Sequence, residues 1–422
     1  MIWPGLPIKR IGDVFLGKMI QPEQKSASDV AAPYLRAAHV QPNGQIIDVD
    51  DKTMWFRDGE LALHDLRRDD VVIVEGGAGY GRSAVIRDDR DGWGFQNSIV
   101  RIRPQPALAS GRFLDYALQS ALAAGEVEVA CFTATIPHFT ADKVGAFQVP
   151  APPVGAQRAI ADYLDRETPR IDTLIEEQQR LIETLRERRR SAISSTVARG
   201  LDESVALKDS GLPGAGPVPA HWVVRPLRYT ISFQEGPGIM AADFRDEGVP
   251  LLRVSSVRSA RSTLEGCNYL DPADVERRWS HFRVDLGDLL ISASASMGTV
   301  SEVTEETAGS VPYTGIIRIK PGRMHKDFIR WFVVSGEFID QVDSLKTGST
   351  IQHFGPTHLA QMRVALPPAD EQRQIAAYLD EETAKIDTLI AETERFIDLA
   401  RERRAALITA AVTGQIDVRE MA

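Results

Sequence analysis

The chain contains the stretch QRAIADYLDRETPRIDTLI at Gln157–Ile175 and repeats it, as QRQIAAYLDEETAKIDTLI, at Gln372–Ile390. Fourteen of the nineteen aligned positions are identical, and the two copies lie 215 residues apart. Similarity at one fixed offset is the signature of an internal duplication. The duplication therefore decides how this chain is organised.

The match extends beyond these two stretches. Pro152-Pro153 aligns with Pro367-Pro368 at the same offset, and with a short gap Ile99–Ile102 resembles Ile316–Ile319. The helical copies are alike, whereas the sequences before them have diverged. The repeat predicts four segments, which are a globular unit at residues 1–150, a long helix at 151–206, a second globular unit at 207–363 and a second long helix at 364–422.

Both repeated segments are predicted to be long helices. Each follows a Pro-Pro pair, which can mark a helix start, and no Gly or Pro interrupts the second copy from Glu371 to Thr413. The first copy contains only Pro169. Apolar residues recur in alternating steps of four and three, the heptad pattern of a coiled coil. The predicted seam consists of Leu164, Ile171, Ile175, Ile182 and Leu185 in the first helix and Leu379, Ile386, Ile390, Ile397 and Leu407 in the second. We expect Leu174, Leu181, Leu389, Phe396 and Ile408 to broaden it.

A helix of this length needs a partner for its apolar stripe. About 40 helical residues span about 60 Å, and isolated helices gain most of their stability from packing. The repeat is the nearest candidate partner, and antiparallel pairing would create a pseudo-two-fold axis with one globular unit near each end. The alternative is that each helix belongs to a larger bundle.

The globular units are predicted to be mixed α/β or mainly β, so that the whole chain is α+β. Short apolar, largely β-branched runs between Gly-, Asp- and Ser-rich turns predict strands at Asp70–Val74, Asn97–Ile102, Asp288–Ser292 and Thr314–Ile319. A helix is expected after each set of strands, at Gly111–Ala124 and His325–Val342. Between the first long helix and the second unit, Asp209–Ala220 reads DSGLPGAGPVPA, which is typical of a linker.

Composition narrows the class of protein. The chain has 422 residues, 43% of them hydrophobic and 26% charged, which is typical of a folded multidomain protein. No apolar run approaches the roughly 18 residues of a membrane span, so no membrane association is expected. The two cysteines, Cys131 and Cys267, exclude a disulfide scaffold and fit a reducing cytoplasm.

The net charge of −10 is unevenly distributed. Residues 364–422 hold 7 basic against 12 acidic side chains, whereas residues 1–150 hold 16 against 19 and residues 207–363 hold 17 against 18. The two globular units are thus nearly neutral. A polyanionic partner would have to meet local arginine clusters rather than a broad basic face.

Arginines do cluster in turn-rich sequence of both units. Arginine reads guanine through a bidentate fork, and Asn or Gln reads adenine. The candidate DNA-binding residues, which flank Trp93 and Trp279, are Arg57, Arg67, Arg68, Arg82, Arg87, Arg90, Gln96 and Asn97 in the first unit and Arg258, Arg261, Arg277, Arg278, His281 and Arg283 in the second. The alternative for each arginine is solvation or pairing with the equally numerous carboxylates.

Catalytic and metal-binding patterns are weak. The glycines of Gly76–Gly81 lack the Lys-Ser/Thr of a phosphate-binding loop, and Arg82–Arg87 has the pattern of another strand, so we expect a hairpin loop there, with Ser292–Gly298 as its counterpart. His353 and His358 lack neighbouring ligands, which favours capping or core packing over a metal site. No catalytic constellation is found in the sequence.

Several stretches together resemble one family, the specificity (S) subunits of type I restriction-modification systems. The resemblance covers essentially the whole chain and rests on LKDSGLPGAGPVPAHWVVRPL (Leu207–Leu227), TGSTIQHF (Thr347–Phe354) with its divergent copy TATIPHF (Thr133–Phe139), LPPADEQRQIAAYL (Leu366–Leu379) and GDLLIS (Gly287–Ser292). The first copy departs from the pattern, with Val154-Gly155-Ala156 in place of Ala369-Asp370-Glu371.

The resemblance implies a non-catalytic DNA-reading subunit. Each globular unit would be a target recognition domain for one half of a split, asymmetric sequence of double-stranded DNA. The long antiparallel helical pair would separate the two domains, set the spacing between half-sites and dock two methylation (M) subunits, and restriction (R) subunits would complete the nuclease. The chain itself would hold no cofactor, because S-adenosylmethionine and ATP would be bound by the methylation and restriction subunits.

Two other classes remain open from the residues alone. A coiled-coil adaptor without DNA recognition explains the helices but leaves two different globular units without a task. An enzyme using the glycine loop does not explain why the helices are nearly duplicated while the units that carry the loop have diverged.

Overall fold

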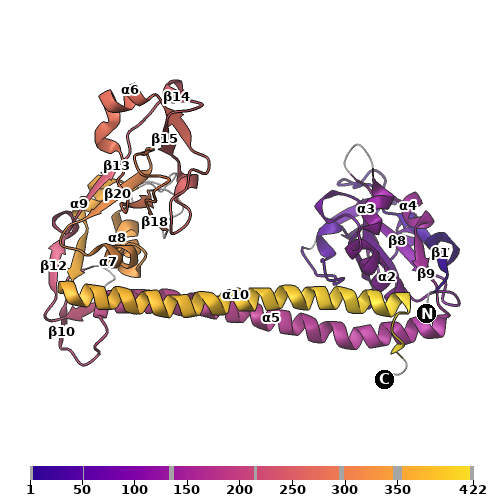
Figure 1. The fold of residues 1–422 in the computed structure, drawn as a ribbon. Coiled ribbons are helices and arrows are strands. Elements are labelled where there is room, and N and C mark those ends of the chain that lie inside the picture. The colour runs from indigo at the N-terminus through magenta and orange to yellow at the C-terminus, as the bar shows by residue number, and fades with distance from the viewer. Residues whose placement is uncertain are drawn as a thin grey trace. The chain divides into compact units, whose positions relative to one another are not determined.

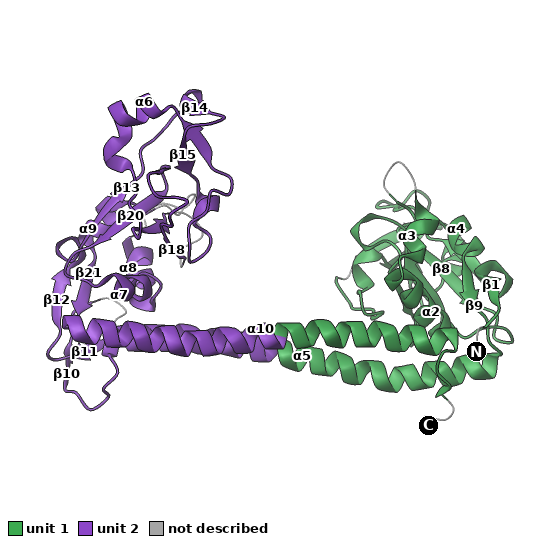
Figure 2. Cartoon of the chain, in the orientation of Figure 1, with its two compact units in different colours: residues 1–179, 394–422 green, residues 180–393 purple. Residues whose placement is uncertain are grey.

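The computed structural model describes residues 3–50, 52–132, 137–212, 216–293, 299–345 and 354–418. The chain forms two compact units (Figure 2), of which unit 1 contains Met1–Gln179 and Glu394–Ala422 and unit 2 contains Arg180–Thr393. Each unit thus combines one globular part with a portion of both long helices.

The globular part of unit 1 is built on two sheets. One has the strand order β2-β8-β5-β6 and the other β4-β3-β7, while β1 and β9 form a separate pair. Strand pairs are antiparallel except for β3 with β7. The strands are β1 Gly5–Pro7, β2 Gly12–Leu16, β3 Val30–Leu35, β4 Thr53–Phe56, β5 Val71–Val74, β6 Ser83–Val85, β7 Gly94–Phe95, β8 Ile99–Pro104 and β9 Gln148–Pro150.

Strand β5 shows why the apolar runs of this unit do not alternate with polar residues. Successive side chains of a strand point to opposite faces of the sheet. Val71 and Ile73 belong to one buried cluster, and Val72 and Val74 to another on the opposite face. Both faces are therefore covered, which favours a continuous apolar run.

The helices of unit 1 are α1 Glu60–Leu63, α2 Gly111–Ala123, α3 Glu126–Cys131 and α4 Ala141–Ala146, together with parts of α5 Val154–Arg199 and α10 Ala369–Thr413. The helices other than α1 pack on the face that carries Val71 and Ile73, whereas Leu61 of α1 packs on a separate cluster formed by β3 and β4. Ile160 and Leu164 of α5 share a core with Ile408 and Val412 of α10. Further along α5, Asp172 forms an ion pair with Arg404, which precedes Ile408 in α10. The two helices therefore run in opposite directions within unit 1.

Unit 2 repeats this plan. Its sheets have the orders β13-β20-β17-β18 and β14-β16-β15-β19, with β12-β21 and β10-β11 as separate pairs, and its parallel pair is β15 with β19. The strands are β10 Leu207–Asp209, β11 Pro217–Pro219, β12 Val223–Pro226, β13 Ile231–Glu235, β14 Phe244–Arg245, β15 Val249–Leu252, β16 Asn268–Leu270, β17 Leu289–Ser292, β18 Val300–Glu302, β19 Val311–Pro312, β20 Ile316–Pro321 and β21 Arg363–Leu366.

The core of unit 2 also contains both long helices. Ile193 of α5 and Leu379 of α10 belong to one cluster with Trp222, which is fully buried. Arg189 of α5 forms an ion pair with Asp387 of α10. The short helices are α6 Pro272–Asp274, α7 Lys326–Phe332, α8 Gly336–Leu345 and α9 Pro356–Gln361.

The long-helix prediction is confirmed. Figure 1 shows α5 and α10 side by side, and they contain 46 and 45 residues, about 69 Å at 1.5 Å per residue. Each begins directly after its Pro-Pro pair, and α5 continues through Pro169. The predicted seam residues are all buried or half-buried.

Three expectations differ from the structure. Leu174, Leu181, Leu389 and Phe396 are exposed rather than part of the seam, because two paired helices bury only a narrow stripe, whereas Ile408 is buried. The helix expected at His325–Val342 is two helices, α7 and α8. The expected linker includes part of the β10-β11 pair.

Parts of three stretches singled out in the sequence lie outside the described residues. These parts are residues 133–136 of Thr133–Phe139, residues 347–353 of Thr347–Phe354, which include His353, and residues 294–298 of the Ser292–Gly298 loop.

Candidate nucleic-acid interface

Two segments hold equivalent places in the two units and carry many of the candidate DNA-binding residues. The β4–β5 segment, residues 57–70, joins β4 to β5, and the β16–β17 segment, residues 271–288, joins β16 to β17. Both lead into an inner strand of a four-stranded sheet. The first carries Arg57, Arg67 and Arg68, and the second carries Arg277, Arg278, His281 and Arg283.

The arginines of the β4–β5 segment are all exposed. Arg67 Nε donates to Asp65 Oδ2 at 2.6 Å, yet 62% of its side chain remains exposed. Arg57 and Arg68 are fixed through their backbone N–H groups, and that of Arg68 donates to Asp89 Oδ1 at 2.9 Å. Ion pairs this exposed contribute little stability and can be exchanged for a phosphate or a base.

The β16–β17 segment combines arginines with aromatic rings. Arg278 lies 4.1 Å from the ring centroid of Trp279 and bonds Asp243, and Arg277 bonds Asp274. Such stacking orients a guanidinium while leaving donors available at its rim. Further along the segment, His281 is exposed and Arg283 is half-buried, with Nη1 donating to the Gly309 carbonyl at 3.2 Å.

The remaining candidates of unit 1 are dispersed. Arg82 is half-buried directly before β6, and Gln96 and Asn97 are half-buried in the turn between β7 and β8. Arg87 forms a bidentate pair with Asp165 of α5, at 2.9 and 3.4 Å, so its charge is already engaged. Arg90 stacks on Trp93 at 4.9 Å.

In unit 2, Arg258 and Arg261 are exposed in the turn that follows residues 254–257. This turn lies outside the β16–β17 segment. The structure therefore groups the candidates of each unit on one shared segment and on additional turns, and does not join all of them in a single cluster.

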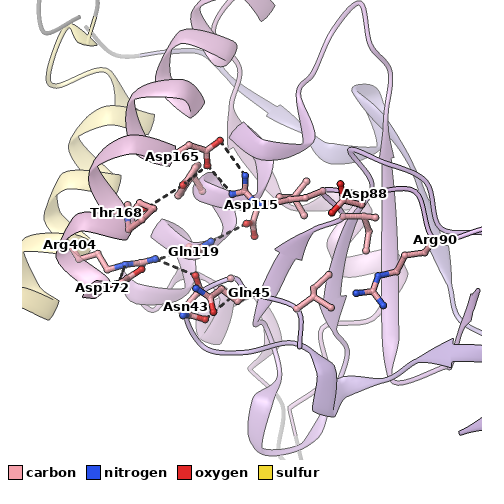
Figure 3. Close-up of a pocket in the computed structure, with 17 residues that line it drawn as sticks. Asn43, Gln45, Asp88, Arg90, Asp115, Gln119, Asp165, Thr168, Asp172 and Arg404 are labelled. Atoms are coloured by element: carbon pink, nitrogen blue, oxygen red, sulfur yellow. Dashed lines mark hydrogen bonds and ion pairs between the residues drawn. The ribbon is translucent and has the colours of Figure 1, made fainter. Parts of the chain in front are cut away.

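Arg87 and Arg90 also line a cleft of about 440 Å³ in unit 1 (Figure 3). Two of its arginines pair with carboxylates of the same cleft, Arg87 with Asp165 at 2.9 Å and Arg404 with Asp172 at 2.8 Å, and Arg404 also donates to the Asn43 carbonyl at 3.2 Å. At its base, burial raises the pKa of Asp115 to about 6, and Ser83 Oγ donates to this carboxyl at 2.7 Å. The cleft thus ties a loop, α2 and both long helices together.

The glycine-rich stretch Gly76–Gly81 forms a hairpin loop, as the sequence predicts. Strands β5 and β6 pair antiparallel on either side of it, with a 3-10 turn at Gly77–Gly79. His358 caps α9 by accepting the Gly355 N–H at Nδ1, at 3.0 Å. Among the described residues, no group of three or more His, Cys, Asp or Glu side chains is arranged to hold a metal ion. No helix in the described part of the chain is long and apolar enough to cross a bilayer.

The sequence analysis missed the cations that lie behind these segments. Arg103 of β8 bonds Asp70 through two nitrogens, at 2.8 and 2.7 Å. Arg101 of the same strand donates to the Asp65 carbonyl of the β4–β5 segment at 2.6 Å. Arg318 and Lys320 of β20 stand in the equivalent places. The faint match of Ile99–Ile102 with Ile316–Ile319 already contained the signal, since an arginine recurs inside two apolar strands.

The long helices expose large apolar side chains away from their seam. In unit 1 these include Leu174 and Phe396, which we term the first apolar pair, and in unit 2 Leu181 and Leu389, the second apolar pair. Their exposed fractions are 37%, 43%, 42% and 48%. The repeat offset maps one pair onto the other, because Leu174 aligns with Leu389 and Leu181 with Phe396. Large apolar side chains are therefore exposed at aligned positions of both copies.

Sequence comparison finds one family. Residues 273–395 match the type I restriction modification DNA specificity domain. The type I restriction enzyme MjaVIII specificity subunit of Methanocaldococcus jannaschii is 22% identical over 293 residues, which are 68% of this chain and 66% of that protein. The EcoKI specificity subunit of Escherichia coli is 22% identical over 214 residues, 48% of this chain and 45% of its own. The matched region thus spans about half to two thirds of these relatives.

Solved structures show the same fold over nearly the whole chain. One solved structure concerns complex assembly and conformational transition of the type I R-M system. A chain of that structure has a TM-score of 0.76 at 15% identity, with 98% of both chains covered. The HsdS subunit from Thermoanaerobacter tengcongensis has a TM-score of 0.58 at 16% identity, covering 98% of this chain and 97% of that one.

Proposed function

We propose that this chain, which is similar to type I restriction-modification specificity subunits, is such a subunit and reads a bipartite, asymmetric DNA sequence with its two units. The observation that carries this proposal is the duplication itself. The sheets β2-β8-β5-β6 and β13-β20-β17-β18 share one strand order, and a segment precedes β5 and β17 in each unit, yet the side chains on these two segments differ. Two similar scaffolds with different exposed residues are suited to two different half-sites.

The helices would supply spacing and docking. We propose that α5 and α10 set the distance between half-sites and that two methylation subunits bind them, one at each apolar pair. A continuous helix of 46 residues resists bending better than a loop, and an exposed apolar pair offers area that a partner can bury. Restriction subunits would join the same complex.

The chemistry would belong to the partners. In this proposal the chain is a non-catalytic subunit in the cytoplasm, the methylation subunits bind S-adenosylmethionine and the restriction subunits bind ATP. The chain contributes recognition and geometry. Its two globular units are nearly neutral, which implies that the partner subunits make many of the contacts to DNA phosphates. The chain alone would therefore bind duplex DNA weakly and with a strong salt dependence.

A coiled-coil adaptor without DNA recognition is the competing function. An adaptor function does not explain why arginines in exposed segments stack on tryptophan, as Arg278 does on Trp279. The duplicated apolar pairs alone would fit either function.

Mass measurement in solution tests the proposal. The chain mixed with its methylation subunit should give a complex with two methylation subunits per chain, and that complex should bind duplex DNA more tightly than the chain alone. A single methylation subunit per chain, or a complex that does not bind DNA, would contradict the proposal. Tight duplex binding by the purified chain at physiological salt would refute the division of labour between this chain and its partners.

A further inference from the structure

An arginine occupies the same position in two equivalent strands, β8 of unit 1 and β20 of unit 2, and it is buried in β8 and half-buried in β20. Arg101 of β8 pairs in register with Val72 of β5, and Arg318 of β20 pairs with Leu290 of β17. Val72 and Leu290 are each the second residue of their strand. The two arginines therefore occupy equivalent places in two units whose other surface residues have diverged.

Arg101 bonds the backbone of the β4–β5 segment. Its side chain is only 8% exposed, and Nη1 donates to the carbonyl oxygens of Asp65 at 2.6 Å and of Leu63 at 3.3 Å. The guanidinium lies over the rings of Phe15 and Phe95, with centroid distances of 5.7 and 5.3 Å. The aromatic contacts fix its plane, and the carbonyl contacts fix the path of the segment.

Arg318 makes the equivalent contacts in unit 2. Its side chain is 12% exposed, Nη1 donates to the carbonyl of Arg283, and Nη2 donates to the carbonyl of His281 at 3.3 Å. A further bond to Gln234 Oε1 at 2.5 Å takes the place of the aromatic contact that Arg101 makes with Phe15, the residue opposite it on β2. His281 and Arg283 are themselves candidate DNA-binding residues.

A second pair of equivalent residues completes the arrangement. Asp70 and Asp288, which directly precede β5 and β17, each accept a backbone N–H from three residues earlier, from Arg67 and Asp285, at 2.9 Å. A cation on β8 pairs with the carboxylate of Asp70, and a cation on β20 pairs with that of Asp288. These are Arg103 Nη2 to Asp70 Oδ2 at 2.7 Å and Lys320 Nζ to Asp288 Oδ2 at 3.7 Å.

We propose that Arg101 and Arg318 are positioning residues for DNA recognition, each of which holds the segment that presents its unit's exposed recognition side chains. This inference rests on the proposed function and names the residues that shape the reading surface. Neither arginine is exposed enough to contact DNA itself. Each acts by bonding carbonyl oxygens of the segment from below, and a planar guanidinium can bond two carbonyls at once in a fixed geometry, which an ammonium group cannot reproduce.

The test compares half-site discrimination by the complex of this chain with its methylation subunits. Its substrates are a duplex with the full methylated sequence and two duplexes in which one half-site is scrambled. Arg101→Lys should lower discrimination at one half-site by about tenfold or more, because losing a good base contact changes affinity by at least about this factor, and should leave the other half-site unchanged. Arg318→Lys should do the reverse. Arg170→Lys, on the surface of α5, is the matched control and should change neither.

Discrimination is a ratio of affinities, so a variant that merely reduces the folded fraction does not change it. Hydrogen exchange of the purified chain gives a second measurement, in which Arg101→Lys should increase exchange in residues 57–70 and not in residues 271–288. Should Arg101→Lys fail to fold, Asp65→Asn removes one carboxylate contact of Arg101 and Arg103 and should weaken discrimination at the same half-site. Unchanged ratios, or equal losses at both half-sites, would overturn the inference. A wild-type complex that reads no bipartite sequence would instead overturn the proposed function.

Discussion

Arg404 Nε lies 2.8 Å from Asp172 Oδ1, and the repeat offset of 215 residues maps this pair onto Arg189 and Asp387, whose Nε and Oδ1 atoms are also 2.8 Å apart. The duplication has thus preserved a specific interhelical ion pair in each unit. The environments of the two pairs differ. The side chains of Arg404 and Asp172 are 15% and 22% exposed, whereas those of Arg189 and Asp387 are 33% and 52% exposed.

We expect the two ion pairs to contribute unequally to stability. Asp172→Asn leaves a largely buried cation without its charge partner and should lower the free energy of unfolding by about 2 kcal/mol, whereas Asp387→Asn should cost less than about 1 kcal/mol because water screens the remaining charge. Urea-induced unfolding of the two variants measures both values. An equal or larger loss for Asp387→Asn would contradict this ranking.

Gly17 and Gly236 lie directly after β2 and β13, where their backbone closely approaches the backbone of another segment. A Cβ atom on Gly17 would lie 2.0 Å from the Gln96 carbonyl oxygen, and one on Gly236 would lie 2.0 Å from that of Pro312. Because backbone atoms cannot easily move away, Gly17→Ala and Gly236→Ala should each lower the free energy of unfolding by more than about 2 kcal/mol.

Gly155 of α5 is the matched control for these two glycines. A Cβ atom there would meet nothing within 4 Å, and alanine favours a helix by up to about 1 kcal/mol over glycine. Gly155→Ala should therefore raise the thermal unfolding midpoint while the other two variants lower it. A neutral result at Gly17 or Gly236 would show that the facing backbone can move away at little cost.

Glu337 of α8 should make stability depend on pH. Burial raises the pKa of its carboxyl to about 7, so the folded state disfavours the ionised form. The penalty is complete above pH 7 and disappears as the pH falls toward the ordinary glutamate value. Glu337→Gln should therefore raise the free energy of unfolding by up to about 3 kcal/mol at pH 8 and by almost nothing near pH 4.5. A difference that does not change with pH would argue against a buried ionised carboxylate.

The apolar pairs predict a stepwise loss of partners. Leu174→Glu with Phe396→Glu should remove one methylation subunit from the complex, and Leu181→Glu with Leu389→Glu should remove the other, because a buried unpaired charge opposes docking. Light scattering of each complex gives the stoichiometry. Glu177→Gln, at an exposed polar position of α5, serves as the control. Retention of both subunits by either double variant would exclude that pair as a docking surface.

The features that could be predicted from the sequence depend on local pattern. The Pro-Pro pairs marked the starts of α5 and α10, and the apolar runs marked β5 and β17, because helix starts and strand runs are set by neighbouring residues. The break between α7 and α8 was missed. There the Ser335 hydroxyl accepts the Phe338 N–H, and the Gly336 N–H bonds Ser194 of α5, which is distant in sequence.

The candidate interface was harder to predict for the same reason. Whether an arginine is free or engaged depends on residues far along the chain, as with Arg87, whose partner Asp165 is 78 residues away. Burial was equally hard to predict, since the sequence analysis assigned no role to Arg101 and Arg318, whose side chains are only 8% and 12% exposed and bond the segments that carry the exposed arginines.

The most direct test of the central claim is a map of methylated bases in a genome exposed to this chain and its methylation subunit, before and after exchange of residues 1–150 for the matching unit of a relative. We predict a split sequence with a fixed spacer, of which the exchange alters one half and leaves the other half and the spacer unchanged. A continuous sequence, or an exchange that alters both halves or neither, would contradict the account.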